Sequence, residues 1–348
     1  VNPHIHTPYI YQYNLSIQHQ LAHSYVAEIN YVGSSSKGLT GLVDENPFIL
    51  GTNTRVLNPA ALAASPSISA FCNSLGLASA ASECPFPIVD DFDNVGFATF
   101  NSVETSLTKR IDSNPYFGNA YFTLGYTYGR SIDNSSGFRN NTSTIPFYNH
   151  SAFRGPSDFD VTNRITFSGS WNLPFANLWT GGPKTITDGW RMDPIFTWQT
   201  GFPLSPGAGI NPNGDPTQPG PSGAGDGFLA DAAFAPGFTS VTILNPKLSK
   251  NRYFAAGTFT GALTAADSYG APRGTFRGPG LTNLDLALVK DTKLTEKVTA
   301  ELRGEAFNIL NNVEFNNPSL NIRSPSRFGR ITSAAAPRIV QLALRLSF

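Results

Sequence analysis

The sequence predicts an all-β fold, namely an antiparallel transmembrane β-barrel. Apolar and polar side chains alternate in about nine segments of roughly ten residues, and the connections between these segments are alternately short and long. Charged residues make up only 14% of the chain, whereas an ordinary soluble domain has about 25%. No apolar run reaches the roughly 18 residues that a transmembrane helix requires, so strands must cross any membrane.

The first two strands are expected at residues 9–17 and 25–32. Tyr11 and Tyr13 share one face of the first segment, and the alternation resumes after a tight turn, so the two segments predict a hairpin. The tract from residue 33 to about 94 is rich in Ser, Ala, Asn and Pro and lacks sustained alternation. It is therefore expected to be one long loop with at most short helical pieces.

The middle strands are expected at residues 99–111, 119–128, 164–173 and 190–200, which show the same alternation. A polar loop over residues 129–160 separates the second from the third of these strands. In the last one Pro194 lies on the apolar face, where it is expected to weaken the ladder because proline has no N–H to donate.

The longest break, residues 201–280, contains a stretch from 205 to 227 so rich in Gly, Pro, Asn and Asp that a loop or mobile flap is expected there. Three strands follow, at residues 281–290, 298–307 and 338–348. Ten side chains in the nine strands are expected to face lipid: Tyr11, Tyr13, Phe122, Leu124, Phe167, Trp171, Phe196, Trp198, Leu286 and Leu344.

The alternation of short and long connections distinguishes a barrel from a soluble β-sandwich. Outer-membrane barrels have short periplasmic turns and long extracellular loops, whereas a sandwich would not place every long loop at one end. In a sandwich the apolar side chains would meet in a core between two sheets. The pattern favours the barrel, with outer-membrane lipid as its surroundings.

The last strand carries an unbroken apolar face that ends in an aromatic residue. Its members are Val340, Leu342, Leu344, Leu346 and Phe348. A C-terminal aromatic in such a strand resembles the signal read by the machinery that assembles outer-membrane barrels. The alternative is an ordinary edge strand of a soluble sheet, although five apolar residues in phase would invite unwanted pairing there.

Short sequence pieces that follow one another along nearly the whole chain carry a resemblance to a known family. They are residues 27–33 (AEINYVG), 126–133 (YTYGRSID), 157–160 (SDFD), 172–175 (NLPF), 199–204 (QTGFPL), 283–290 (NLDLALVK), 299–312 (TAELRGEAFNILNN) and 315–318 (FNNP). Taken together, these pieces resemble the C-terminal barrel of TonB-dependent outer-membrane receptors. The more specific likeness is to the Oar-like group, whose members carry a carboxypeptidase-regulatory-like domain.

The resemblance implies a partial chain, since such receptors have about 22 strands, an N-terminal plug and a TonB box. About nine strands are found in residues 1–348, and an open barrel leaves edges that hydrocarbon cannot tolerate. Residues 1–348 are therefore expected to be the C-terminal portion of the barrel, with the plug and N-terminal strands outside this chain. The resemblance also implies the bacterial outer membrane as location, an unknown ligand, and the TonB energy-transducing complex as a partner through the missing region.

The sequence predicts no enzyme, because the serine-hydrolase elbow, the zinc-protease helix and the phosphate-binding loop are all absent. Glu301, Arg303 and Glu305 share a strand face that would suit an acid/base pair in an enzyme, but in a barrel this face points into the lumen. A net charge of zero gives no reason to expect nucleic acid as a partner. No cofactor is expected.

Metal sites are weakly indicated, and none is predicted. His19 and His23 would lie about 13 Å apart on one strand, too far for one ion, and His4 and His6 read as solvated. Acidic groups beside the loops, at residues 90–93 and 158–160, could suggest calcium, but carboxylates that accept backbone hydrogen bonds are the simpler interpretation.

Cys72 and Cys84 lie in the first long loop, and an oxidising exterior would allow them to form a disulfide that closes a small ring. Two unrelated thiols are the alternative. Two functions of different classes remain open: a transporter that binds a ligand outside and passes it through the barrel, and a surface-displayed structural or adhesive barrel.

Overall fold

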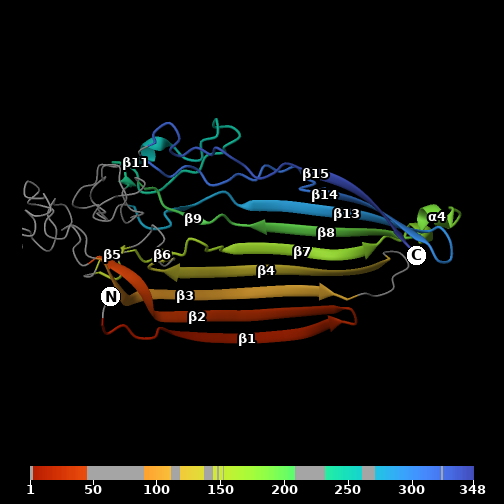
Figure 1. Ribbon diagram of the computed structural model, residues 1–348, viewed down its shortest axis with the longest axis horizontal. Helices are drawn as coiled ribbons and strands as arrows, with labels where there is room; N and C mark the ends of the chain where they lie inside the picture. Colours follow the sequence, from red (N-terminus) through yellow and green to blue (C-terminus); the bar gives the residue numbers. More distant parts are fainter. Residues whose placement is uncertain are drawn as a thin grey trace, which may run out of the picture.

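The computed structural model describes residues 3–44, 90–110, 118–136, 144–146, 149–151, 153–207, 232–260, 271–322 and 324–348. One antiparallel sheet dominates them, and its long strands neighbour one another in chain order (Figure 1). The path is β1 (Tyr9–Ala22), β2 (Tyr25–Asp44), β3 (Asp90–Lys109), β4 (Asn119–Asp133), β7 (Asn163–Asn172), β8 (Trp190–Gln199), β13 (Leu281–Lys293), β14 (Thr299–Phe307) and β15 (Ile339–Ser347). Within the described residues, β1 and β15 are the two edges of this open sheet.

The nine strands of the path are those that the alternation predicts, and their register determines which side chains share a face. Tyr126 of β4 stands opposite Ile165 of β7, which stands opposite Trp198 of β8, and residues directly opposite in an antiparallel pair lie on the same face. Followed through all strands, this rule puts the ten side chains expected to face lipid on one side of the sheet. None of them belongs to a buried core, so the soluble sandwich is excluded for the described chain.

The two ends of the sheet differ, as the connection lengths predict. Figure 1 shows the short turns and the C-terminus at one end, and the long connections at the other. Two short helices, α3 (Phe175–Leu178) and α4 (Lys184–Thr187), lie in the turn between β7 and β8. None of the helices in the described part of the chain is both long and apolar enough to span a bilayer.

The prediction of one long loop over residues 33–94 is wrong at both ends of that range. β2 continues to Asp44 and β3 begins at Asp90, with irregular register between Lys37 and Gly41. Residues 42–44 also pair in parallel with the short strand β5 (Thr144–Pro146). In this ribbon backbone pairing persists without the alternation of apolar and polar side chains that identifies a strand in sequence.

The described parts of residues 201–280 and 308–338 also depart from expectation, because they form a packed unit, here called the loop head. Two small ladders hold it: β9 (Pro203–Leu204) with β12 (Phe276–Arg277), and β10 (Ala233–Phe234) with β11 (Phe259–Thr260). Its buried cluster comprises Leu204, Ala232, Tyr253, Phe254, Phe259, Ala271, Phe276, Phe328 and Ile331. The flap expected at residues 205–227 lies outside the described residues from 208 onward.

Candidate functional site

The face opposite the apolar one carries a chain of charged side chains centred on β14. Arg303 donates to Glu305 (Nη1 to Oε1, 2.9 Å), and its Nε lies 3.8 Å from a carboxylate oxygen of Glu301. Gln341 of β15 also donates to Glu305. The three residues singled out in the sequence therefore lie side by side, because alternate positions of one strand point the same way.

Asp193 of β8 links this group to the neighbouring strands. Its carboxylate accepts a hydrogen bond from Ser170 of β7 (2.6 Å) and lies 3.2 Å from Nε of Arg191 and 4.0 Å from Nη2 of Arg303. Ala287 of β13 stands between Asp193 and Glu305 in the register. Because this intervening side chain is small, the long arginine can reach two strands away.

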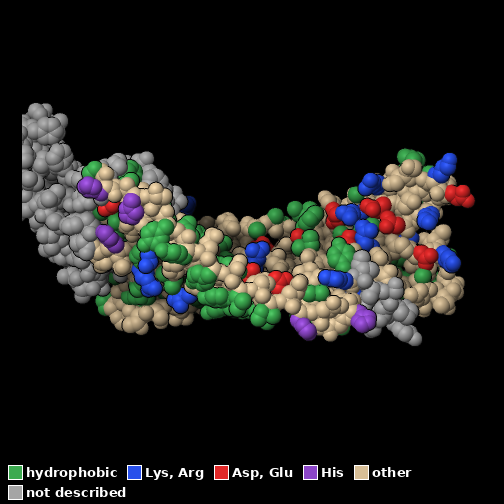
Figure 2. All heavy atoms as spheres, turned by 90° about the horizontal axis from the view of Figure 1, so that it is seen from below, with side chains coloured by type: hydrophobic (Ala, Val, Ile, Leu, Met, Phe, Trp, Pro, Cys, Tyr) green, Lys and Arg blue, Asp and Glu red, His purple; other side chains and the backbone are tan. Residues whose placement is uncertain are grey.

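A polar hollow of about 580 Å³ opens beside Asp193 on the same face. Most of its lining residues carry amide, hydroxyl or charged groups, and Gly169 and Ile195 complete it: Asn119, Tyr121, Ser168, Gly169, Ser170, Asn172, Arg191, Asp193 and Ile195. Figure 2 views the sheet from its β1 edge and shows hydrophobic side chains along the lower border of the middle of the molecule, with charged side chains above that border and toward both ends. The two faces thus have opposite chemistry.

A buried ion-pair group joins the loop head to the rim of β4. Arg273 pairs with Asp133, and both side chains are almost completely buried. The guanidinium also donates to Ser136 and, at 3.0 Å, to Asp158. Burying a charge is costly unless it is paired and hydrogen-bonded, and Arg273 meets both conditions here.

A second group lies beside it and uses the carboxylate of Asp160. Arg277 pairs with this carboxylate and also donates to the backbone carbonyls of Asp160 and Gly201, both at 3.0 Å. The other oxygen of Asp160 accepts the backbone N–H of Ser131. The interpretation of loop carboxylates as backbone acceptors is thus confirmed at Asp160, whose charge is matched by an arginine. Among the described residues no group of three or more potential ligands could hold a metal ion.

Both ion-pair groups are built from sequence pieces that carry the family resemblance. Asp133 and Ser131 end the piece at 126–133, Asp158 and Asp160 belong to SDFD, and Gly201 belongs to QTGFPL. A Cβ on Gly201 would lie 1.9 Å from the carbonyl oxygen of Gly278, so only glycine permits this approach. The two arginines that complete the groups were missed, because nothing in the sequence marks Arg273 and Arg277 as partners of Asp133 and Asp160, which lie 140 and 117 positions earlier.

Two titratable groups of the loop head have shifted pKa values. Burial raises the pKa of Tyr253 to about 12, and its hydroxyl donates to the carbonyl of Arg277 (2.8 Å). Burial and, second, the negative charge of Asp285 raise the pKa of the Glu314 carboxyl. One oxygen of Glu314 is buried without a hydrogen-bond partner among the described residues.

The other predicted site residues lie apart from this charged face. Val340, Leu342, Leu344 and Leu346 are exposed on the apolar face of β15, and Phe348 follows the strand with its side chain exposed. Cys72 and Cys84 lie outside the described residues, so their disulfide stays a prediction. His19 stands within β1 and His23 in the turn after it, and His6 exchanges backbone hydrogen bonds with the Asn94 side chain.

A comparison with known protein families identifies the family to which this chain belongs. The family model described as "Outer membrane beta barrel domain" matches residues 1–341. The chain belongs to this family. It is therefore an outer-membrane β-barrel chain of the bacterial outer membrane, and its apolar face is the one that meets lipid. No curated protein matches it.

Two solved structures show a distant likeness to this barrel chain. The outer membrane transporter YddB from Escherichia coli has a TM-score of 0.47 and 11% identity, over 99% of this chain and 33% of YddB. The structure of the FpvAI–pyocin S2 complex has a TM-score of 0.39 and 9% identity, over 97% of this chain and 26% of that one. The barrel chain thus spans about a third of these proteins or less.

Proposed function

We propose that this barrel chain is the C-terminal portion of a TonB-dependent receptor of the Oar-like group, which binds a ligand outside the cell and passes it through the barrel. The observation that carries the proposal is the loop head, which is packed and which is tied to the ends of the strands by ion pairs with the buried carboxylates of Asp133 and Asp160. A loop assembly held in this way presents a defined surface to a ligand, because its side chains lose little freedom on binding.

In this proposal the charged face lines the lumen. Glu301, Arg303 and Glu305 there form a wall with Asp193 that offers both signs of charge to a passing ligand or to a plug. The salt bridges are partly exposed, so a polar group can exchange with one partner at low cost. The plug, the TonB box and the remaining strands would be supplied by sequence outside residues 1–348.

Photocross-linking in whole cells tests the TonB dependence of the full-length protein. A photoreactive residue placed in the periplasmic region of TonB should form a cross-link to the receptor, and deletion of the TonB box should remove it. Lys184→Gln in the exposed turn helix α4 serves as a matched control, and its cross-link should be unchanged. Absence of the cross-link in all strains would contradict the proposal. If loss of the protein then reduced only attachment of cells to surfaces, the structural or adhesive alternative would replace it.

We also propose that Val340, Leu342, Leu344, Leu346 and Phe348 form the signal that delivers the chain to the barrel assembly machinery. Phe348 has 93% of its surface exposed, so its removal costs the folded protein little packing. Deletion of Phe348 should reduce the amount of heat-modifiable, membrane-inserted protein several-fold. Leu248→Ala is the matched control, because Leu248 is an apolar loop-head residue with 84% exposure. Equal insertion of both variants would refute the assembly signal.

A further inference from the structure

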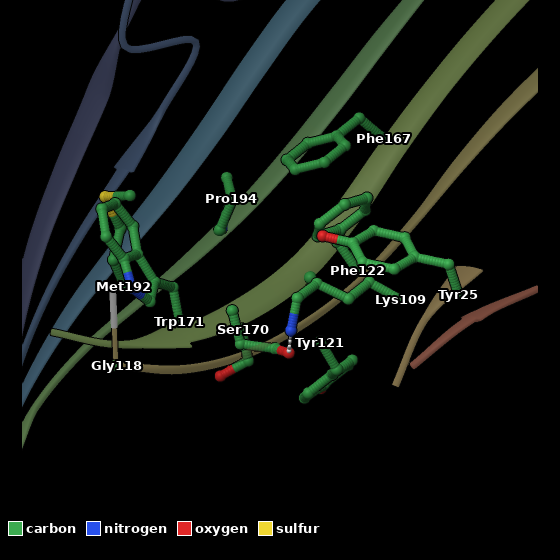
Figure 3. A pocket seen from close by; sticks show the side chains of 12 residues that line it. Tyr25, Lys109, Gly118, Tyr121, Phe122, Phe167, Ser170, Trp171, Met192 and Pro194 are labelled. Carbon is green, nitrogen blue, oxygen red and sulfur yellow. Dashed lines mark hydrogen bonds between the residues drawn. The ribbon is translucent and has the colours of Figure 1, made fainter. Parts of the chain in front are cut away.

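A hollow of about 630 Å³ interrupts the apolar face near the short turns (Figure 3). The register of β7 with β8 runs from Ser168 opposite Ile195 to Trp171 opposite Met192, and the two pairs between them are missing. Pro194 lies in this gap and has no N–H to donate. The sheet surface is therefore open at this point, as the position of proline on the strand predicts.

Gly169 of β7 has no side chain to fill the hollow. A Cβ at this position would lie 2.5 Å from the carbonyl oxygen of Tyr121 and 2.8 Å from Cβ of Phe122, so a larger residue does not fit without movement of the backbone. Ala120 of β4 stands opposite Trp171 and also presents only a methyl group. Small residues thus form the floor of a groove between the large side chains that surround it on this face.

Aromatic side chains form the walls of this groove. Tyr25 and Phe122 are 6.4 Å apart between ring centroids, and Phe122 and Phe167 are 5.6 Å apart. Trp171 and Met192 stand on the opposite side (Figure 3). Because these residues belong to the lipid-facing side, the groove opens toward hydrocarbon, and a flexible apolar chain fits its shape and chemistry.

Lys109, the last residue of β3, lies at the rim of the groove. Its ammonium donates to the carbonyl of Ala120 (3.1 Å) and stands 5.8 Å from the centroid of the Tyr25 ring. A lysine at the membrane interface lays its stem along apolar surface and holds its charge at headgroup level. This charge complements a phosphate that is covalently joined to acyl chains.

We propose that the groove binds one anionic glycerophospholipid from the periplasmic leaflet of the outer membrane. One acyl chain lies between the aromatic walls over Gly169 and Pro194, and the headgroup phosphate contacts Lys109. The leaflet follows from the position of the groove beside the short turns, which are periplasmic. The proposal is independent of the transport function, because it concerns only the outer surface of the barrel.

Two variants separate the contributions of chain and headgroup. Lys109→Gln removes the charge and keeps a polar side chain of similar reach. Ala120→Phe fills the groove with a ring and leaves the charge in place. Lys184→Gln is the control, since Lys184 lies in the turn at the same end of the sheet but does not line this groove. Heat modifiability on gels verifies that each variant is folded.

Native mass spectrometry of the full-length protein, with equal amounts of phosphatidylglycerol and phosphatidylethanolamine in the detergent, measures the retained lipid. The unaltered protein and Lys184→Gln should retain one phosphatidylglycerol. Lys109→Gln should lower this retention about 5-fold, the factor that corresponds to about 1 kcal/mol per basic residue, and Ala120→Phe should abolish retention of both lipids. Equal lipid retention in all variants would overturn the proposal. It would also be overturned if a polypeptide co-purified with the unaltered protein and was lost in Ala120→Phe, because the groove would then bind a protein segment.

Discussion

Leu342 in β15 and Phe254 in the loop head are both large apolar side chains, yet Leu342 is 79% exposed and Phe254 is completely buried. The nine-stranded sheet directs its apolar residues outward, where lipid replaces a protein core. The loop head stands in water and must bury its own apolar residues. Apolar content is therefore no guide to burial in this molecule. Its two regions depend on different solvents, and the same kind of substitution should affect them differently.

The largest difference is expected from truncation of a buried loop-head side chain. Phe254 contacts the rings of Phe259, Phe276 and Phe328 at centroid distances of 5.1–5.6 Å. Phe254→Ala should destabilise the loop head by about 3–5 kcal/mol, so that protease cleaves it readily in intact cells. Leu342→Ala should leave cleavage unchanged, because lipid fills the space of the lost side chain. Equal protease sensitivity of the two variants would mean that the head has no core of its own.

A smaller effect is expected from a charge on the lipid-facing side of the nine-stranded sheet. Leu344→Arg in β15 should cost about 2–4 kcal/mol if the residue lies near the bilayer midplane, measured as urea unfolding in lipid vesicles. Arginine at the neighbouring position, Ala343→Arg, points to the charged face and should cost much less. A larger cost for Ala343→Arg would reverse the assignment of the two faces.

The smallest effect concerns Glu314 of the loop head. Because its pKa is raised above the ordinary value of 4.5, the unfolded chain ionises first as pH rises, and the folded state loses stability between 4.5 and the raised pKa. Glu314→Gln should therefore raise the midpoint of thermal unfolding at pH 7.5 but not at pH 4. A gain of equal size at both pH values would contradict ionisation as the cause.

The strands of the nine-stranded sheet could be predicted well from the sequence, because contact with lipid requires a strict alternation of side chains. A strand in contact with hydrocarbon must alternate, so the pairs Phe167–Phe196 and Leu302–Leu344 could be assigned to one face from the period alone. The charged triplet Glu301, Arg303 and Glu305 was found for the same reason. Outside the membrane this rule ends, and the extensions of β2 and β3 were mistaken for loop.

Length, alternation and turn spacing by themselves determined the class of fold, the order of the strands and the face that meets lipid. The tertiary structure alone decided the loop head and its ties to the rim, because Arg273 with Asp133 and Arg277 with Asp160 join residues 140 and 117 positions apart. It also decided that Gly169 and Pro194 leave a groove beside Lys109. Such contacts depend on which segments meet in space, and no local period of the chain encodes that meeting.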